Sequence, residues 1–145
     1  MDTTRPGNAR PIAGAPKGGA AQRSTVTTSD GIALPLYRWP ATTPLRGTVA
    51  LVHGLAEHAG RYAALADRLN SAGFELVAID LRGHGHAPGK RVWVNRFDDY
   101  LLDAQALLDE AATSCAPLFL MGHSMGGAVA ALYAIERLEA SGRQL

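Results

Sequence analysis

A Gly-x-Ser-x-Gly pentapeptide spans Gly122 to Gly126, between an apolar run at 117–121 and an alanine-rich stretch at 127–140. The apolar run predicts a buried strand, and the alanine-rich stretch predicts a helix. This order is typical of a nucleophile elbow, in which a serine is held on a sharp and strained strand-to-helix turn. The pentapeptide therefore predicts an α/β chain in which Ser124 acts as a nucleophile.

The two glycines of the pentapeptide have a steric role in this interpretation. The turn leaves no room for side chains two residues before and two residues after the serine, at Gly122 and Gly126. The same turn points the side chain of His123 away from Ser124. We therefore interpret His123 as a structural or supporting residue.

The rest of the chain alternates between short apolar runs and helical patterns. Residues 25–28 and 32–39 flank Asp30-Gly31 and predict a β hairpin with a two-residue turn. Buried strands are expected at 48–53, 74–80 and 117–121, and helices at 61–72, at 97–112 with Asn95 as N-cap and Asp103 on a polar face, and at 128–135 with burial nearly all round. The predicted class is α/β, a β hairpin followed by β-α-β-α-β-α around a mainly parallel sheet.

The composition predicts one globular domain with a short tail. Residues 1–24 are rich in Pro, Gly and Ala and predict a disordered tail, whereas residues 25–145 predict the domain. A net charge of +1 gives no reason to expect nucleic acid or an anionic membrane surface as a partner. No apolar stretch is long enough for a secretory signal or a transmembrane segment, although the basic tail leaves an organelle-targeting presequence as an alternative. The single cysteine, Cys115, fits a cytoplasmic location and is interpreted as a buried bystander thiol.

A serine nucleophile that attacks a carbonyl needs donors for the oxyanion that forms. The N–H of Met125, at the start of the helix after the serine, is the natural first donor. The second donor is expected in the loop after an earlier strand, where His53 and Gly54 close the run at 48–53. We assign this donor to Leu55 N–H, with Gly54 permitting close approach. The alternative is that His53-Gly54 is an ordinary strand-terminating turn.

A second glycine-rich segment, Asp80 to Gly85, ends the next predicted strand. His84 and His86 form a His-x-His pair, but a hydrolytic metal site needs three or more ligands, so no metal is expected. We expect Asp80 and Arg82 to pair and to hold this loop near the site. His58 is interpreted as structural.

Three motifs in this order resemble the monoacylglycerol lipase and lysophospholipase branch of the α/β-hydrolase superfamily, whose domains are also described as serine aminopeptidase-like. The motifs are His53 to His58 with Arg61-Tyr62, Asp80 to Gly85 with Gly89 and Arg91, and Gly122 to Gly127. The resemblance implies that residues 25–145 form the N-terminal half of an α/β-hydrolase domain. It implies a serine hydrolase that cleaves a lipid or small ester through an acyl-enzyme on Ser124, without a cofactor. One departure is His86-Ala87, after the Gly-His-Gly segment, where relatives usually carry serine.

The resemblance also defines what this sequence does not contain. The family's triad acid and histidine follow the serine, but neither Asp nor His follows Ser124 here. We expect the chain alone to be nearly inactive, because loss of a triad histidine can lower turnover by roughly 10⁶. His53 is the nearest upstream substitute, although the family geometry assigns it to the oxyanion loop. The alternative function is a non-catalytic half-domain that pairs with itself or with a complementary chain through an exposed strand edge.

Overall fold

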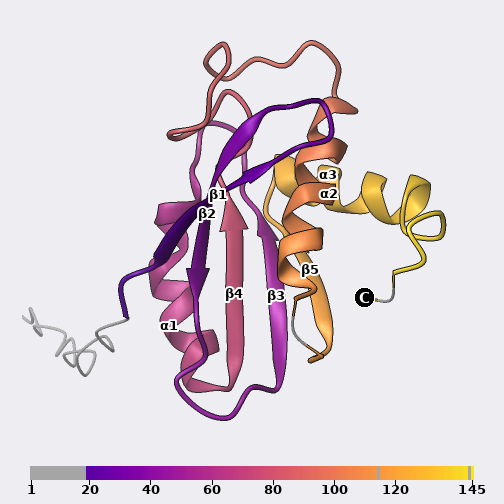
Figure 1. Cartoon of the computed structure of the whole chain (residues 1–145). Helices are drawn as coiled ribbons and strands as arrows, with labels where there is room; N and C mark the ends of the chain where they lie inside the picture. Colours follow the sequence, from indigo (N-terminus) through magenta and orange to yellow (C-terminus); the bar gives the residue numbers. More distant parts are fainter. Residues whose placement is uncertain (1–18, 114, 144) are drawn as a thin grey trace, which may run out of the picture.

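The computed structural model describes residues 19–113, 115–143 and 145, which form a mixed sheet with helices on both faces (Figure 1). The elements are β1 (Gln22–Thr27), β2 (Ala33–Trp39), β3 (Gly47–Val52), the 3-10 turn η1 (Ala59–Tyr62), α1 (Ala63–Ser71), β4 (Phe74–Ile79), α2 (Asp99–Ala111), β5 (Leu118–Gly122) and α3 (Met125–Glu136). The strand order is β1-β2-β4-β3-β5, with antiparallel pairing for β1, β2 and β4 and parallel pairing of β3 with β4 and β5. The predicted α/β class, a hairpin followed by parallel strands, is confirmed.

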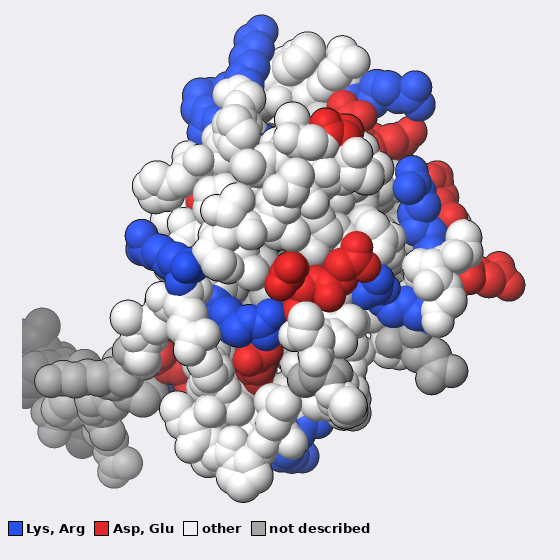
Figure 2. Space-filling model, viewed as in Figure 1, with Lys and Arg blue, Asp and Glu red and all other residues white. Residues whose placement is uncertain are grey.

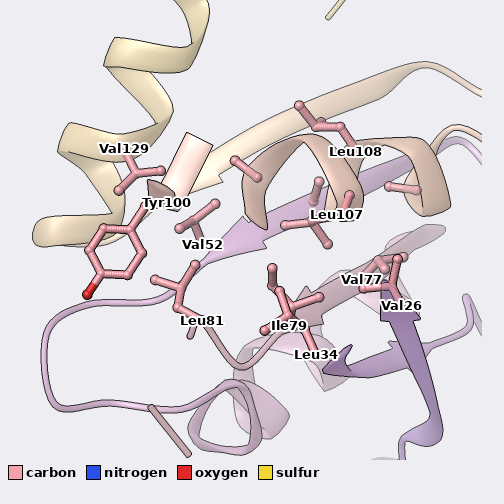
Figure 3. Packing of buried hydrophobic residues seen from close by; sticks show 14 of the residues in the cluster. Val26, Leu34, Val52, Val77, Ile79, Leu81, Tyr100, Leu107, Leu108 and Val129 are labelled. Atoms are coloured by element: carbon pink, nitrogen blue, oxygen red, sulfur yellow. The ribbon is translucent and has the colours of Figure 1, made fainter. Parts of the chain in front are cut away.

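The core lies in two layers, one on each face of the sheet. The larger cluster joins the sheet to α2 and α3, and the smaller cluster joins it to α1. Figure 3 shows Leu107 and Leu108 of α2 over the strands, close to side chains such as Ile79. Strand β3 is buried at every position, as expected for a strand covered on both faces. This burial holds β3 in place, and the candidate site begins at the carboxyl end of this strand.

The hairpin differs from its prediction in both its start and its turn. β1 begins at Gln22, which pairs with Arg38, so residues 22–24 belong to the sheet and not to the tail; residues 1–18 lie outside the described residues. The turn is one residue longer than expected, since Thr28 N–H donates to Ile32 O at 2.9 Å and three residues lie between them. The Thr28 hydroxyl accepts from Ile32 N–H and donates to Asp30, which stabilises the longer loop. Gly31 has the expected positive φ of 85°.

Helix α2 departs from the predicted pattern at its start and on its polar face. It begins at Asp99, because residues 96–98 form tight turns that end in donation from Tyr100 N–H to Phe97 O. Asn95 therefore does not cap the helix. Asp103 was expected on a polar face but is fully buried, where it pairs with Arg82.

Helix α3 and strand β5 expose apolar surface at one side of the sheet. Within the described chain β5 pairs with β3 alone, as expected for an edge strand, and Phe119 is 46% exposed. The predicted burial of α3 on all sides is wrong, since Val129 and Tyr133 are buried but Ile135 is 81% exposed. Only one side of α3 has a partner among the described elements.

Two further sequence expectations concern Cys115 and the membrane. Cys115 is exposed in the connection between α2 and β5, so its prediction as a buried thiol is wrong. This position lies outside the strands and helices that build the core. None of the described helices has both the length and the apolar character needed to cross a bilayer.

Candidate active site

Ser124 occupies the turn between β5 and α3, in the strained conformation that the pentapeptide predicts. Its φ is 53° and its ψ is −119°, a combination that residues other than glycine rarely adopt. Such strain persists only where the surrounding structure imposes it, and it occurs most often at functional positions. The Ser124 residue is exposed, so its hydroxyl is open to an incoming substrate.

The two glycines that flank this turn are required by space. A Cβ atom on Gly122 would lie 2.2 Å from Gly126 O, and one on Gly126 would lie 2.1 Å from Val52 O. Real Cβ atoms essentially never approach another atom within 3.0 Å. Both obstructing atoms belong to the backbone and cannot rotate away. The elbow therefore packs directly against the end of β3.

The amides proposed as oxyanion donors lie just beyond the carboxyl ends of two neighbouring strands. Leu55 follows β3 and Met125 begins α3, and the strands before them are neighbours in the sheet. His123 N–H donates to Val52 O at 3.1 Å, which joins the two segments. Neither Leu55 N–H nor Met125 N–H has an acceptor within the described part of the chain. Both donors are free to bind an oxygen of a ligand.

Glu57 connects the loop after β3 to the serine turn, and sequence reasoning missed this role. Its Oε2 accepts from Gly54 N–H at 2.9 Å, from the Tyr62 hydroxyl at 2.8 Å and from His123 Nδ1 at 3.1 Å. The hydrogen bond from Tyr62, followed by that from Gly54, lowers the pKa of Glu57 to about 2. Glu57 therefore remains a carboxylate at neutral pH. The three-residue spacing from Gly54 was the available sequence signal.

His53 does not serve as the base for Ser124. Its Nδ1 donates to Gly54 O at 2.8 Å, and its Nε2 accepts from Leu81 N–H at 3.0 Å. Burial, the largest influence, lowers the pKa of the His53 imidazole, so the ring is neutral with both nitrogens occupied. The ring instead joins the loop after β3 to the loop after β4. The supporting role of His53 and Gly54 in an oxyanion loop stays a prediction.

The predicted pair of Asp80 and Arg82 does not form. Asp80 accepts hydrogen bonds from Ala59 N–H at 2.8 Å and from His86 N–H at 2.9 Å. Arg82 instead pairs with Asp103 at 2.7 Å and with Asp30 at 2.8 Å. Asp80 directly follows β4 and binds the loop at 58–59, whereas Arg82 binds Asp103 of α2. The two residues hold different ends of the same loop.

The other histidines of the described chain also lack a hydrogen bond to the Ser124 hydroxyl. Among the described residues no histidine forms a hydrogen bond with the Ser124 hydroxyl, and no group of three or more His, Cys, Asp or Glu side chains could hold a metal ion. His84 is buried, with its ring 5.2 Å from that of His53 and its Nδ1 donating to Arg82 O. His58 is exposed and His123 faces Glu57. Within the described residues, Ser124 therefore lies beside two open amides, and no histidine is hydrogen-bonded to its hydroxyl.

Known proteins share this arrangement of sequence and fold. The family described as "Serine aminopeptidase, S33" matches residues 43–143. A monoacylglycerol lipase of Mycolicibacterium smegmatis is 40% identical over 71% of this chain and 38% of its own length. The human monoglyceride lipase is 36% identical over 77% of this chain and 38% of its own length. A phospholipase of Bacillus subtilis, YtpA, is 37% identical over 66% of this chain and 36% of its length.

A solved structure gives the same result for the fold. A soluble variant of the Saccharomyces cerevisiae monoglyceride lipase, bound to a substrate analog, superposes with a TM-score of 0.68 and 27% identity. The match covers 90% of this chain and 43% of that lipase. The chain therefore spans well under half the length of these relatives. On the evidence of the family match, the elbow and the fold, the chain belongs to the serine aminopeptidase S33 family of α/β hydrolases.

Proposed function

We propose that this chain carries the nucleophile and oxyanion half of a carboxylic ester hydrolase of the monoacylglycerol or lysophospholipid type. The observation that carries the proposal is Ser124, held at a φ of 53° beside the unpartnered amides of Leu55 and Met125. Relatives named monoacylglycerol lipase and phospholipase support a lipid ester as substrate. The cytoplasmic location inferred from the single cysteine is part of the same proposal.

The chemistry proposed is acyl transfer to Ser124. The hydroxyl oxygen attacks the ester carbonyl while its proton passes to a base, and the carbonyl oxygen becomes an oxyanion between Leu55 N–H and Met125 N–H. Collapse of this intermediate expels the alcohol and leaves an acyl-enzyme, which water then hydrolyses. None of the described histidines forms a hydrogen bond with the Ser124 hydroxyl, so the 145-residue chain is expected to turn over roughly 10⁶ more slowly than a complete triad.

A fluorophosphonate probe tests the missing base. The purified chain should label weakly, at a rate close to that of its Ser124→Ala variant. Fast labelling that disappears in Ser124→Ala would show that a base is present and would contradict the low reactivity.

A graft tests the hydrolase function itself. Residues 43–143 would replace the matching segment of the Mycolicibacterium smegmatis monoacylglycerol lipase, which leaves the rest of that enzyme in place. We expect the graft to hydrolyse monoacylglycerol and to lose this activity with Ser124→Ala. A folded graft without hydrolysis would contradict the proposed function.

The second candidate function is a non-catalytic half-domain. It is favoured by the edge strand β5, on which Phe119 and Met121 are 46% and 40% exposed. An exposed strand edge with apolar side chains can pair with a second copy or with a complementary chain. Sedimentation velocity should then show a concentration-dependent dimer. A monomer at all concentrations would count against self-pairing.

A further inference from the structure

The loop between β4 and α2 gathers exposed apolar and basic side chains. Val92, Trp93 and Phe97 are 47%, 50% and 40% exposed. Lys90, Arg91 and Arg96 are interspersed with them, and the sequence from 81 to 97 contains no Asp or Glu. We call residues 90–97 the basic aromatic loop. The net charge of +1 hides this cluster because it averages over the whole chain.

The loop is held in shape with its apolar tip outward. Val92 has a φ of 53°, an outlier for a β-branched residue, and its N–H donates to Gly83 O at 2.9 Å. The Arg91 guanidinium donates to the carbonyl oxygens of Gly85 and Gly89 at 3.0 and 3.1 Å. These contacts fix the backbone while Val92 and Trp93 remain exposed. A strained backbone that keeps apolar side chains exposed is more typical of a binding surface than of a loop that packs onto the core.

Two of the three basic side chains of the loop, Lys90 and Arg91, have no carboxylate partner among the described residues, while Asp98 and Asp99 directly follow the loop. Carbonyl oxygens, and not a carboxylate, surround Arg91. The Lys90 ammonium lies 5.1 Å from the centroid of the Trp93 ring, with no carboxylate partner among the described residues. Arg96 alone has an acidic partner, Asp98, at 3.2 Å in an exposed pair. Such charges attract anions and are screened by salt.

The basic aromatic loop lies at the end of the sheet where the parallel strands β3, β4 and β5 finish, which is the end that carries the candidate site. The loop segment that leads to it starts at Leu81, whose N–H is bound by His53 of the loop after β3. Figure 1 shows this segment arching over the end of the sheet where β3 and β4 point. In Figure 2, seen from the same side, Lys and Arg side chains project at that upper end.

We propose that the basic aromatic loop docks this chain onto an anionic bilayer surface. Tryptophan is favoured at the membrane interface because its ring is apolar and its N–H is polar, and lysine and arginine are attracted by anionic headgroups. Docking through this loop turns the end of the sheet that bears Ser124 toward the lipid. The contact is a binding event that needs no turnover, so it holds or fails independently of the proposed hydrolysis.

The intrinsic tryptophan fluorescence of the chain can report binding to vesicles. Trp39 is 3% exposed in the core and Trp93 is 50% exposed in the loop. Phosphatidylcholine vesicles that contain phosphatidylserine should shift the fluorescence of Trp93 to shorter wavelength and protect it from acrylamide, whereas pure phosphatidylcholine vesicles should do so much less. Raising the salt from about 0.1 M to about 1 M should reverse the shift, because the Debye length falls from about 10 Å to about 3 Å.

Co-sedimentation of variants with the same vesicles tests whether the basic aromatic loop makes the contact. Trp93→Ala should weaken binding at least fivefold, and Lys90→Gln about fivefold, since one basic residue near an anionic surface contributes about this factor. Leu45→Ala removes a similarly exposed apolar residue, 46% exposed before β3, and Arg68→Gln removes an exposed charge on α1; both should bind as the unmodified chain does. Circular dichroism confirms that each variant is folded.

Three results would overturn the proposal. The first is no co-sedimentation with the phosphatidylserine vesicles at low salt. The second is an equal loss in Trp93→Ala and Leu45→Ala, which would indicate general apolar adhesion. The third is binding that soluble polyglutamate abolishes and that Trp93→Ala leaves unchanged, which would point to an acidic protein. The Ser124→Ala chain should bind vesicles normally, which separates this result from any failure of the hydrolase assays.

Discussion

His123 Nδ1 lies 3.1 Å from Glu57 Oε2, although 66 positions separate the two residues in the sequence. His123 belongs to the serine turn, and Glu57 also accepts from Gly54 N–H in the loop that precedes Leu55. The carboxylate therefore joins the two segments that carry the proposed oxyanion donors. Preorganised donors of this kind lose their effect when their separation is not fixed.

Replacing Glu57 with alanine should destabilise the chain by about 2 kcal/mol, because hydrogen bonds to a charged group contribute about 1.5 to 3 kcal/mol. Urea unfolding at neutral pH measures the change. Hydrogen exchange should also show faster exchange at the Gly54 amide, which loses its acceptor. Glu139→Ala is the control, since Glu139 is exposed near the end of the chain. Equal stability of the two variants would contradict the bridging role.

The stability that Glu57 contributes should depend on pH below neutrality. The folded pKa of Glu57 is lowered to about 2, first by the hydrogen bond from Tyr62, whereas an unperturbed glutamate titrates near 4.5. Between these values the unfolded chain binds a proton that the folded chain does not, so stability rises with pH in this window. The contribution is complete above pH 4.5 and is lost as the pH falls through about 2.

A comparison with Glu57→Gln isolates this titration from that of Asp30, whose pKa is also lowered to about 2, chiefly by its hydrogen bond with Arg82. The difference in unfolding free energy between the unmodified chain and Glu57→Gln should shrink steadily from pH 5 toward pH 2. A difference that stays constant over this range would show that the Glu57 charge is not stabilised by folding.

The glycines of the serine turn should tolerate no side chain. Gly126→Ala places a Cβ 2.1 Å from Val52 O, and Gly122→Ala places one 2.2 Å from Gly126 O, so either variant should lose roughly 4 kcal/mol or fail to fold. Gly127→Ala is the matched control, because its Cβ would be 3.5 Å from the nearest atom, an ordinary contact. Alanine in a helix interior should raise stability there by about 0.5 to 1 kcal/mol. Circular dichroism and thermal unfolding measure the stability of the three variants. Equal stability of all three would refute the packing argument.

The fold was predictable because its signals are local. The apolar run at 48–53 and the helical pattern at 61–72 predict β3 and α1 to within about two residues. The Ser124 turn was predictable for the same reason, since its two glycines stand next to it in the sequence. Burial was harder to predict where it depends on what surrounds an element, and the exposed outer side of α3 is the example.

The polar contacts that connect separate elements were not predictable in this way. Glu57 meets His123 across 66 positions, and Arg82 meets Asp103 and Asp30 across 21 and 52. Charge and spacing allowed Arg82 to pair with Asp80 equally well, and only the direction of the chain after β4 separates the two choices. Asp103 also looked like a solvent-facing residue of α2, because a charged residue is buried only when a partner reaches it.

That partner makes Asp103 the most sensitive charged position of α2, where it holds Arg82 of the loop after β4. Asp103 is fully buried and accepts from Arg82 Nε at 2.9 Å and from Arg82 N–H at 3.0 Å, whereas Asp30 is 37% exposed on the other side of the same guanidinium. Breaking a buried pair leaves an uncompensated charge, so Asp103→Ala should lose about 3 to 5 kcal/mol. Asp30→Asn should lose less than about 1 kcal/mol, because its pair is exposed to water. Urea unfolding of both variants measures the ratio, and similar losses would mean that Arg82 relies on Asp30 as much as on the buried carboxylate.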